Sequence, residues 1–216
     1  GNQTILFEIP HLSSPAPSAR TLFVPIMKEE IFHEDFSKEV NLIPVNGSWR
    51  VIRAKEPTGV TGYVYYENSY SCNFYAISKQ VFDLESFSIS VYARTLDKHI
   101  CTGLVFAFKD PHNYCLFKYQ EDVNYAYFLA VENGQYKVVE YSFIAVKTGE
   151  WHELRVDVIG DKISCFIDGT KAIECEYSGS KRGKVGLLSG WCPTLFDDLR
   201  IQVTVDPIRS LFIPMF

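Results

Sequence analysis

The sequence is divided into short runs of alternating apolar and polar residues, with turn-forming residues between them. Such runs are typical of β-strands that bury one side in a sheet. Two of the connections, Asn133-Gly134 and Asp168-Gly169, are dipeptides that accept a positive φ, so each predicts a tight hairpin. The sequence therefore predicts an all-β fold, with strands at residues 62–66, 74–77, 87–94, 103–108, 114–119, 125–131, 136–141, 151–159, 163–167, 171–176, 184–188 and 196–205.

The chain is long enough for one sizeable core, because it has 216 residues of which 47% are hydrophobic. We expect a single domain over residues 31–205. Residues 1–30 are predicted to form an N-terminal extension that packs on this domain, and residues 206–216 an apolar C-terminal tail. Both terminal segments place proline among apolar residues, a pattern typical of edge strands or straps. The alternative is that these termini dock on a partner or on a second subunit, which predicts an oligomer.

The charge and hydropathy of the chain argue against nucleic acid binding and against a membrane-spanning helix. The net charge of −5 leaves no basic stripe to neutralise phosphates, so we expect no nucleic acid partner. No apolar run approaches the roughly 18 residues of a membrane-spanning helix.

Several segments near the C-terminus have the pattern of successive antiparallel strands: residues 149–156, 163–170, 183–187 and 196–201. Together they resemble the closing strands of the concanavalin A-like lectin/glucanase superfamily, closest to its laminin-G-like and 3-keto-disaccharide hydrolase-like branches. Residues 106–114 also resemble the family's pair of strands joined by an Asp-x-x-Asn-Tyr turn. The resemblance implies a two-sheet antiparallel jelly-roll sandwich. It also implies an extracellular, periplasmic or cell-surface location.

Catalysis on such a fold requires carboxylates on alternate residues of one strand, as in Glu-x-Asp-x-x-Glu, because alternation points them into one cleft. The sequence has no such run. Its nearest substitutes are Asp83-Leu84-Glu85, which lacks a third acid, and Gln120-Glu121-Asp122, whose acids are adjacent and face opposite ways. We therefore predict no catalytic residues. A glycoside hydrolase of the 3-keto-disaccharide type and a structural domain that assembles through its apolar termini remain as alternatives.

Sugar binding requires exposed aromatic faces and a few polar groups that fix orientation. Alternation places Tyr125 and Tyr127 on one face of a strand, and Tyr119 precedes them across a short connection. We predict that these tyrosines bind a glycan or polysaccharide on the concave sheet, with Asn124 and Arg94 orienting hydroxyl groups. The alternative is that the tyrosines are ordinary packing of a sandwich surface. The favoured function is thus a non-catalytic carbohydrate-binding or adhesion module.

No cofactor is required by this function, but a structural calcium ion is a further hypothesis. Jelly-roll binding modules often hold calcium between the first and the last strand, using carboxylates and backbone carbonyls. Glu34 and Asp35 lie in the opening strand, and Asp197 lies in the closing strand on the predicted inward face. The alternative is that Asp197 bonds backbone amides or an arginine.

The six cysteines have no metal-binding spacing. The predicted hairpin at Asp168-Gly169 places Cys165 opposite Ala172 and Cys175 on the other face, which argues against a Cys165–Cys175 disulfide. Cys72 and Cys192 lie near turns and remain candidates for a long-range disulfide.

Overall fold

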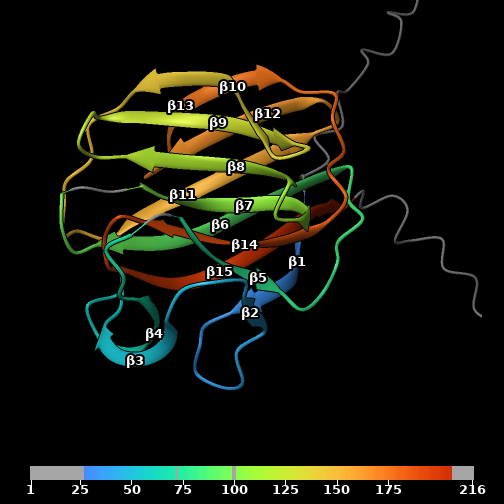
Figure 1. The fold of residues 1–216 in the computed structure, drawn as a ribbon. Coiled ribbons are helices and arrows are strands. Elements are labelled where there is room, and N and C mark those ends of the chain that lie inside the picture. The colour runs from blue at the N-terminus through green and yellow to red at the C-terminus, as the bar shows by residue number, and fades with distance from the viewer. Residues whose placement is uncertain (1–26, 72, 99–100, 206–216) are drawn as a thin grey trace, which may run out of the picture.

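The computed structural model describes residues 27–71, 73–98 and 101–205, and it consists of two packed antiparallel sheets (Figure 1). The jelly-roll sandwich that the sequence predicted is therefore confirmed. The sheet that we call sheet A has the order β13 (Thr170–Glu176), β12 (Lys162–Ile167), β11 (His152–Ile159), β6 (Ser86–Thr95), β15 (Thr194–Val205), β4 (Thr61–Glu67) and β3 (Trp49–Lys55), and β1 (Met27–Glu34) also pairs with β15. Sheet B has the order β10 (Gln135–Phe143), β9 (Tyr125–Glu132), β8 (Asn113–Gln120), β7 (Cys101–Asp110), β14 (Lys184–Gly190), β5 (Phe74–Ser78) and β2 (Leu42–Pro44).

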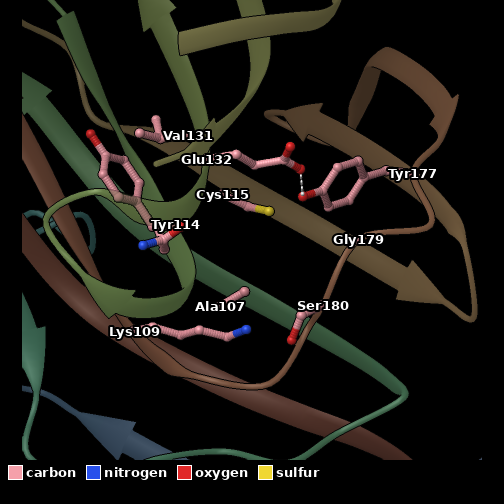
Figure 2. Close-up of a pocket in the computed structure, with 10 residues that line it drawn as sticks. Ala107, Lys109, Tyr114, Cys115, Val131, Glu132, Tyr177, Gly179 and Ser180 are labelled. Atoms are coloured by element: carbon pink, nitrogen blue, oxygen red, sulfur yellow. Dashed lines mark hydrogen bonds between the residues drawn. The ribbon is translucent and has the colours of Figure 1, made fainter. Parts of the chain in front are cut away.

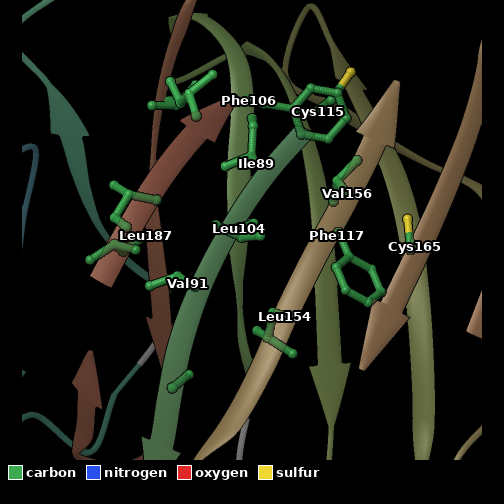
Figure 3. Packing of buried hydrophobic residues seen from close by; sticks show 14 of the residues in the cluster. Ile89, Val91, Leu104, Phe106, Cys115, Phe117, Leu154, Val156, Cys165 and Leu187 are labelled. Carbon is green, nitrogen blue, oxygen red and sulfur yellow. The ribbon is translucent and has the colours of Figure 1, made fainter. Parts of the chain in front are cut away.

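The core lies between the two sheets and is built by strand alternation. Every second residue of β6 and β11 points inward from sheet A, and Figure 3 shows these side chains meeting those of β7 and β8. Phe106 and Phe128 stack at the centre with ring centroids 5.9 Å apart. Each strand has one core face and therefore one outer face, and it is on the two outer faces that ligands have access.

Both predicted hairpins are confirmed, because Asn133-Gly134 and Asp168-Gly169 all have positive φ. The second hairpin contains a β-bulge that the sequence did not predict. It shifts the register between Cys165 and Phe166, so that Cys165 lies opposite Ile173 and Cys175 opposite Ile163. The two thiols therefore share the inner face, and the predicted separation onto opposite faces is wrong. Cys165, Cys175 and Cys192 are free thiols in the structure, whereas Cys72 lies outside the described residues.

Strand β15 changes partner along its length. Its first residues pair with β4, and the segment after residue 198 pairs with β1. A bulge separates the two pairings, and Asp198 adopts φ 54° there. Because β1 begins at Met27, residues 27–30 belong to sheet A and not to an extension. The other residues assigned to the two terminal segments lie outside the described part of the chain.

Residues 27–71, 73–98 and 101–205 contain no helix that is long and apolar enough to cross a membrane.

Candidate functional site

The outer face of sheet B carries a contiguous group of aromatic side chains, which we call the aromatic platform: Tyr125, Tyr127, Tyr141 and Phe143. Register explains the grouping, since Tyr125 pairs with Phe143 and Tyr127 pairs with Tyr141 across β9 and β10. The rings of Tyr127 and Tyr141 stack at 6.2 Å, and the Tyr125 ring lies 5.9 Å from Tyr141 and 5.8 Å from Phe143. Tyr141 is 58% exposed and Phe143 is 65% exposed, so the platform offers ring surface to solvent.

Polar groups border the platform. Lys118 on β8 lies opposite Tyr127, with its Nζ 5.2 Å from the ring centroid, and Gln120 lies opposite Tyr125. Asn124 adopts φ 57° in the turn before β9, where its backbone N–H donates to the backbone carbonyl oxygen of Glu121 at 3.1 Å. Its own carbonyl oxygen accepts from the Ile144 amide at 2.9 Å, which ties this turn to the end of β10. The turn therefore holds an amide side chain directly beside Tyr125.

The carboxylate next to this turn is structural. Glu121 is 7% exposed and accepts hydrogen bonds from the hydroxyl groups of Thr95 and Thr148. Those bonds occupy both carboxylate oxygens and fix the turn between β8 and β9. Asp83, from the other acid pair considered in the sequence, lies 3.6 Å from the Arg182 guanidinium at the surface. Glu121 and Asp83 therefore do not reach the platform.

The platform is the exposed part of a face that is mostly apolar, with Lys118 and Gln120 as its polar members in the rows below. Three rows cross sheet B on this face: Gly190, Cys101, Gln120, Tyr125 and Phe143; Leu188, Gly103, Lys118, Tyr127 and Tyr141; and Gly186, Val105, Leu116, Leu129 and Val138. No residue in these described rows is Asp or Glu. Gly103 leaves the middle of the face low, because a Cβ there would lie 2.2 Å from the Phe117 carbonyl oxygen and no larger residue fits.

A second aromatic group closes the far end of this face. The hydroxyl groups of Tyr75, Tyr114 and Tyr136 form a chain, with oxygen separations of 2.8 Å and 3.1 Å. Burial, reinforced by bonds among the hydroxyls, raises the pKa of Tyr75 and of Tyr114 far above the usual tyrosine range. These groups stay neutral and act as packing, while Tyr136 is exposed.

The structure brings together only part of the predicted glycan site. Tyr125, Tyr127 and Asn124 lie together as predicted. Tyr119 is a correction, because it pairs with the inward-facing Ala126, is 2% exposed and donates from its hydroxyl to the Val146 carbonyl oxygen at 3.1 Å. Strand alternation is the physical reason: Tyr119 has the opposite orientation from Lys118 and Gln120 on the same strand. Arg94 is a second correction, since it lies on β6 and faces out from sheet A, on the opposite side of the sandwich.

Tyr141 and Phe143 belong to the platform and Lys118 borders it, but the sequence analysis identified none of the three. Their spacing of two residues already indicated that Tyr141 and Phe143 share one face of a strand. A bulge between Val138 and Glu140, however, decides which face they take.

The carboxylates predicted to bind calcium have other partners. Glu34 is buried and accepts from the amides of Phe36 at 2.8 Å and Asn41 at 2.6 Å, so it anchors the loop after β1. Asp35 accepts from the amide and hydroxyl of Ser37. Among the described residues no three His, Cys, Asp or Glu side chains gather closely enough to hold a metal. Glu34, Asp35 and Asp197 therefore do not form the predicted three-carboxylate group.

Asp197 differs from the other two carboxylates. The bulge in β15 pairs it with Tyr92, which faces out from sheet A, so the predicted inward orientation alongside Leu199 is wrong. It is 5% exposed and accepts from the Asp198 amide at 2.8 Å. Burial, together with the charge of Asp198, raises its pKa to about 7.

A small pocket opens at one end of the sandwich, between β7, β8, β9 and the segment after β13 (Figure 2). The Tyr177 hydroxyl donates to Glu132 at 3.1 Å beside the Cys115 thiol. Burial raises the pKa of Cys115 to about 12, so it is no thiolate nucleophile at neutral pH. The pocket volume of about 120 Å³ is below the ~150 Å³ of a cavity that takes a benzene ring. The pocket is therefore small for a sugar ring.

No protein-family model and no curated protein matches this sequence. Solved structures do match its fold. The carbohydrate binding module CBM66 from Bacillus subtilis has a TM-score of 0.62 at 19% identity, over 74% of this chain and 93% of that one. The endo-beta-1,3-glucanase from Pyrococcus furiosus has a TM-score of 0.58 at 12% identity, over 84% and 96% of the two chains. Domain 4 of the arabinanase AbnA from Geobacillus stearothermophilus, in complex with arabinotriose, has a TM-score of 0.57 at 15% identity, over 82% and 93%. These similarities confirm the concanavalin A-like lectin/glucanase fold.

Proposed function

We propose that this protein is a non-catalytic carbohydrate-binding module that holds a glycan on the aromatic platform of sheet B. The observation that carries the proposal is the contiguous set of partly exposed rings, Tyr125, Tyr127, Tyr141 and Phe143, bordered by polar side chains. The C–H groups of a sugar ring pack on an aromatic face, and the platform provides several such faces side by side. A glycan chain laid along β9 and β10 would contact more than one ring.

The polar side chains that border the platform, Lys118, Gln120 and Asn124, would orient the sugar through hydrogen bonds. Lys118 donates hydrogen bonds only, whereas the amides of Gln120 and Asn124 both donate and accept. Sugar hydroxyl groups need both kinds of partner. The glycine at position 103 keeps the centre of the face low, which leaves room for a ligand beside the rings.

The lack of Asp and Glu in the three described rows of this face supports binding without cleavage. Glycoside hydrolysis needs two carboxyl groups about 5–10 Å apart on either side of the scissile bond. The described rows that cross the outer face of sheet B contain no Asp or Glu, and Glu121 is bonded to two threonines below it. CBM66 is a carbohydrate binding module and the AbnA domain was solved with arabinotriose, which supports glycan binding on this fold. Such a module would work on glycans outside the cytoplasm, at a cell surface or in the periplasm.

The experiment that tests the proposal is a glycan array and polysaccharide pull-down with wild-type protein and with the triple variant Tyr125→Ala/Tyr127→Ala/Tyr141→Ala. Tyr63→Ala is the matched control, because Tyr63 is also an exposed tyrosine but lies on β4 of sheet A. We expect the wild type and the control to retain the same glycans and the triple variant to lose those that the platform holds. Equal retention by a folded triple variant would reject the platform as the binding site.

A further inference from the structure

The outer face of sheet A contains a groove that runs along the central strand β6. Three serines of β6 point to this face: Ser86, Ser88 and Ser90. The flanking strands carry long side chains at the paired positions. Ser90 lies between Arg155 and Arg200, and Ser88 lies between Asp157 and Gln202. Short side chains in the middle and long ones on both sides produce a groove, and the span from residue 86 to 92 is roughly 20 Å long.

The groove has two sections, and the larger section is lined mainly by polar groups. This part has a volume of about 320 Å³, and its lining consists of Lys28, Ser88, Ser90, Tyr92, Glu153, Arg155, Asp198, Arg200 and Gln202. A second hollow of about 170 Å³ continues it past Ser88 and is more apolar, with Phe87 and Ile159 in its walls. Tyr92 offers a partly buried ring at the other end. The groove thus combines hydroxyl groups, charges and some apolar surface.

The charges in the groove are of both signs and largely paired. Arg200 lies 3.3 Å from Glu30 and 3.1 Å from Asp198, and Arg155 lies 3.3 Å from Asp157. Paired charges create little net field, so the groove does not select a strongly charged ligand.

Arg155 retains hydrogen-bonding capacity. Its guanidinium lies over the Phe166 ring at 4.2 Å, its Nε faces the Asp157 carboxylate at 3.3 Å, and 28% of its side chain is exposed. Asp157 already accepts from the Ser88 hydroxyl at 2.6 Å. The exposed part of the guanidinium can therefore donate to an acceptor that a ligand supplies in the groove.

From this geometry we propose a second binding site, in which the groove along β6 holds a neutral oligosaccharide. Sugar hydroxyl groups accept from Arg155, Arg200 and Lys28 and donate to Glu153 and Asp198, which suits a surface of mixed charge. An extended peptide bound by strand addition needs a free sheet edge, but β6 is paired on both sides, with β11 and β15. A polyanion such as a nucleic acid or a charged polysaccharide meets Glu153 and Asp198 as well as the cations. The inference does not rest on the aromatic platform, which lies on the opposite face of the sandwich.

The test is a titration followed by two-dimensional ¹H–¹⁵N NMR, with cellohexaose, xylohexaose and arabinohexaose as probes, each up to about 5 mM. We expect at least one probe to shift the backbone amides of Ser88, Ser90 and Gln202. Ser90→Trp fills the groove and should raise the Kd at least 20-fold. Ser164→Trp is the matched control, since Ser164 faces the same side from β12. It should change the Kd less than 2-fold.

Thermal unfolding verifies that each variant is folded. If Ser90→Trp does not fold, Gln202→Ala replaces it, with an expected 3- to 10-fold weakening. The proposal is overturned if no probe shifts the groove amides, or if a folded Ser90→Trp variant binds as the wild type does. Chemical-shift changes confined to the backbone amides of Tyr125, Tyr127 and Phe143 would also overturn it, while supporting the platform as a glycan-binding site. Conversely, groove shifts that persist in the Tyr125→Ala/Tyr127→Ala/Tyr141→Ala variant would support the groove independently of the platform.

Discussion

Lys118 and Tyr127 lie directly opposite each other on β8 and β9, and the Lys118 Nζ is 5.2 Å from the centre of the Tyr127 ring. This is a cation–π contact at a partly exposed site, where such contacts contribute about 0.5–1 kcal/mol. The lysine therefore both orients a platform ring and supplies a hydrogen-bond donor next to it.

Replacing Lys118 should weaken glycan binding without unfolding the protein. Lys118→Met keeps most of the apolar stem but removes the charge and the donor. We expect a 2- to 5-fold higher Kd, measured by calorimetry with the saccharide selected on the array. Lys137→Met, which removes an exposed lysine from the neighbouring strand β10, is the control and should bind as the wild type. Unchanged affinity of Lys118→Met would contradict the role given to this lysine.

The rings of the platform should contribute unequally. Tyr125 contacts three other rings, Tyr127, Tyr141 and Phe143, whereas Phe143 contacts only Tyr125 among them. We expect Tyr125→Ala to raise the Kd about 2- to 13-fold, on the basis of roughly 0.5–1.5 kcal/mol for one aromatic contact with the sugar. Phe143→Ala should have a smaller effect. Tyr125→Phe should stay within about 2-fold, because the ring face is kept, and a larger loss would assign the interaction to the hydroxyl instead.

The core between the sheets should respond very differently from the platform. Phe117 is fully buried, so Phe117→Ala should lower the free energy of unfolding by about 3–5 kcal/mol. The same substitution at Phe143, which is 65% exposed, should stay within about 0.5 kcal/mol. Urea denaturation of both variants measures the contrast. Similar losses at the two positions would show that Phe143 is packed in solution.

Stability should fall as the pH rises through the range in which Asp197 ionises. Burial, with the nearby Asp198 charge, raises its pKa from 3.8 to about 7 in the folded protein. Below pH 4 the carboxyl is protonated in both states. Between about pH 4 and 7 only the folded state retains the proton, so the free energy of unfolding declines, by about 4 kcal/mol in all. Asp197→Asn should remove this decline in urea titrations, and an unchanged pH profile of the variant would contradict the assignment.

The same carboxylate offers a test of the calcium hypothesis. A calcium ion bound at Asp197 would favour the ionised form and offset the loss of stability at high pH. Melting curves at pH 8 with 2 mM calcium and with chelator decide the matter. Because the described residues do not group three ligating side chains there, we expect no difference between the two curves. A calcium-dependent rise in Tm that disappears in Asp197→Asn would support the hypothesis instead.

The buried thiols should be unreactive in the folded protein. Burial raises the pKa of Cys115 to about 12 and that of the half-buried Cys175 to about 11. Only about one Cys115 thiol in ten thousand is then a thiolate at pH 8. Iodoacetamide followed by peptide mass spectrometry should label Cys115 in urea but not in buffer within an hour. Rapid labelling of Cys115 in buffer would show that the end pocket opens.

Local pattern predicted the architecture well, because most of the signals for it are short-range. The two hairpin dipeptides and the period-two alternation depend on neighbouring residues, so they indicated strands and turns without any contact information, and the resemblance to the lectin/glucanase superfamily indicated the sandwich. Tyr125 and Tyr127 share a face for the same reason. Where a bulge intervened, the prediction of face was wrong, as at Cys175 and Asp197. An extra residue reverses every later side chain, and the sequence has no clear signal for it.

The sequence by itself determined that this chain forms an all-β sandwich, which strands follow one another, and that two tyrosines of β9 face the same way. Only the tertiary structure decided which strands lie side by side, and hence which residues of distant segments form one surface. Pairing across β9 and β10 places Tyr141 and Phe143 beside Tyr127 and Tyr125 on the platform. Alternation along β8 points the Tyr119 side chain into the core. Arg94 lies on sheet A, whereas the platform lies on sheet B. Pairing of β6 with β11 and β15 placed its serines between two arginines, because strand register over long sequence separations depends on the packing of both sheets together.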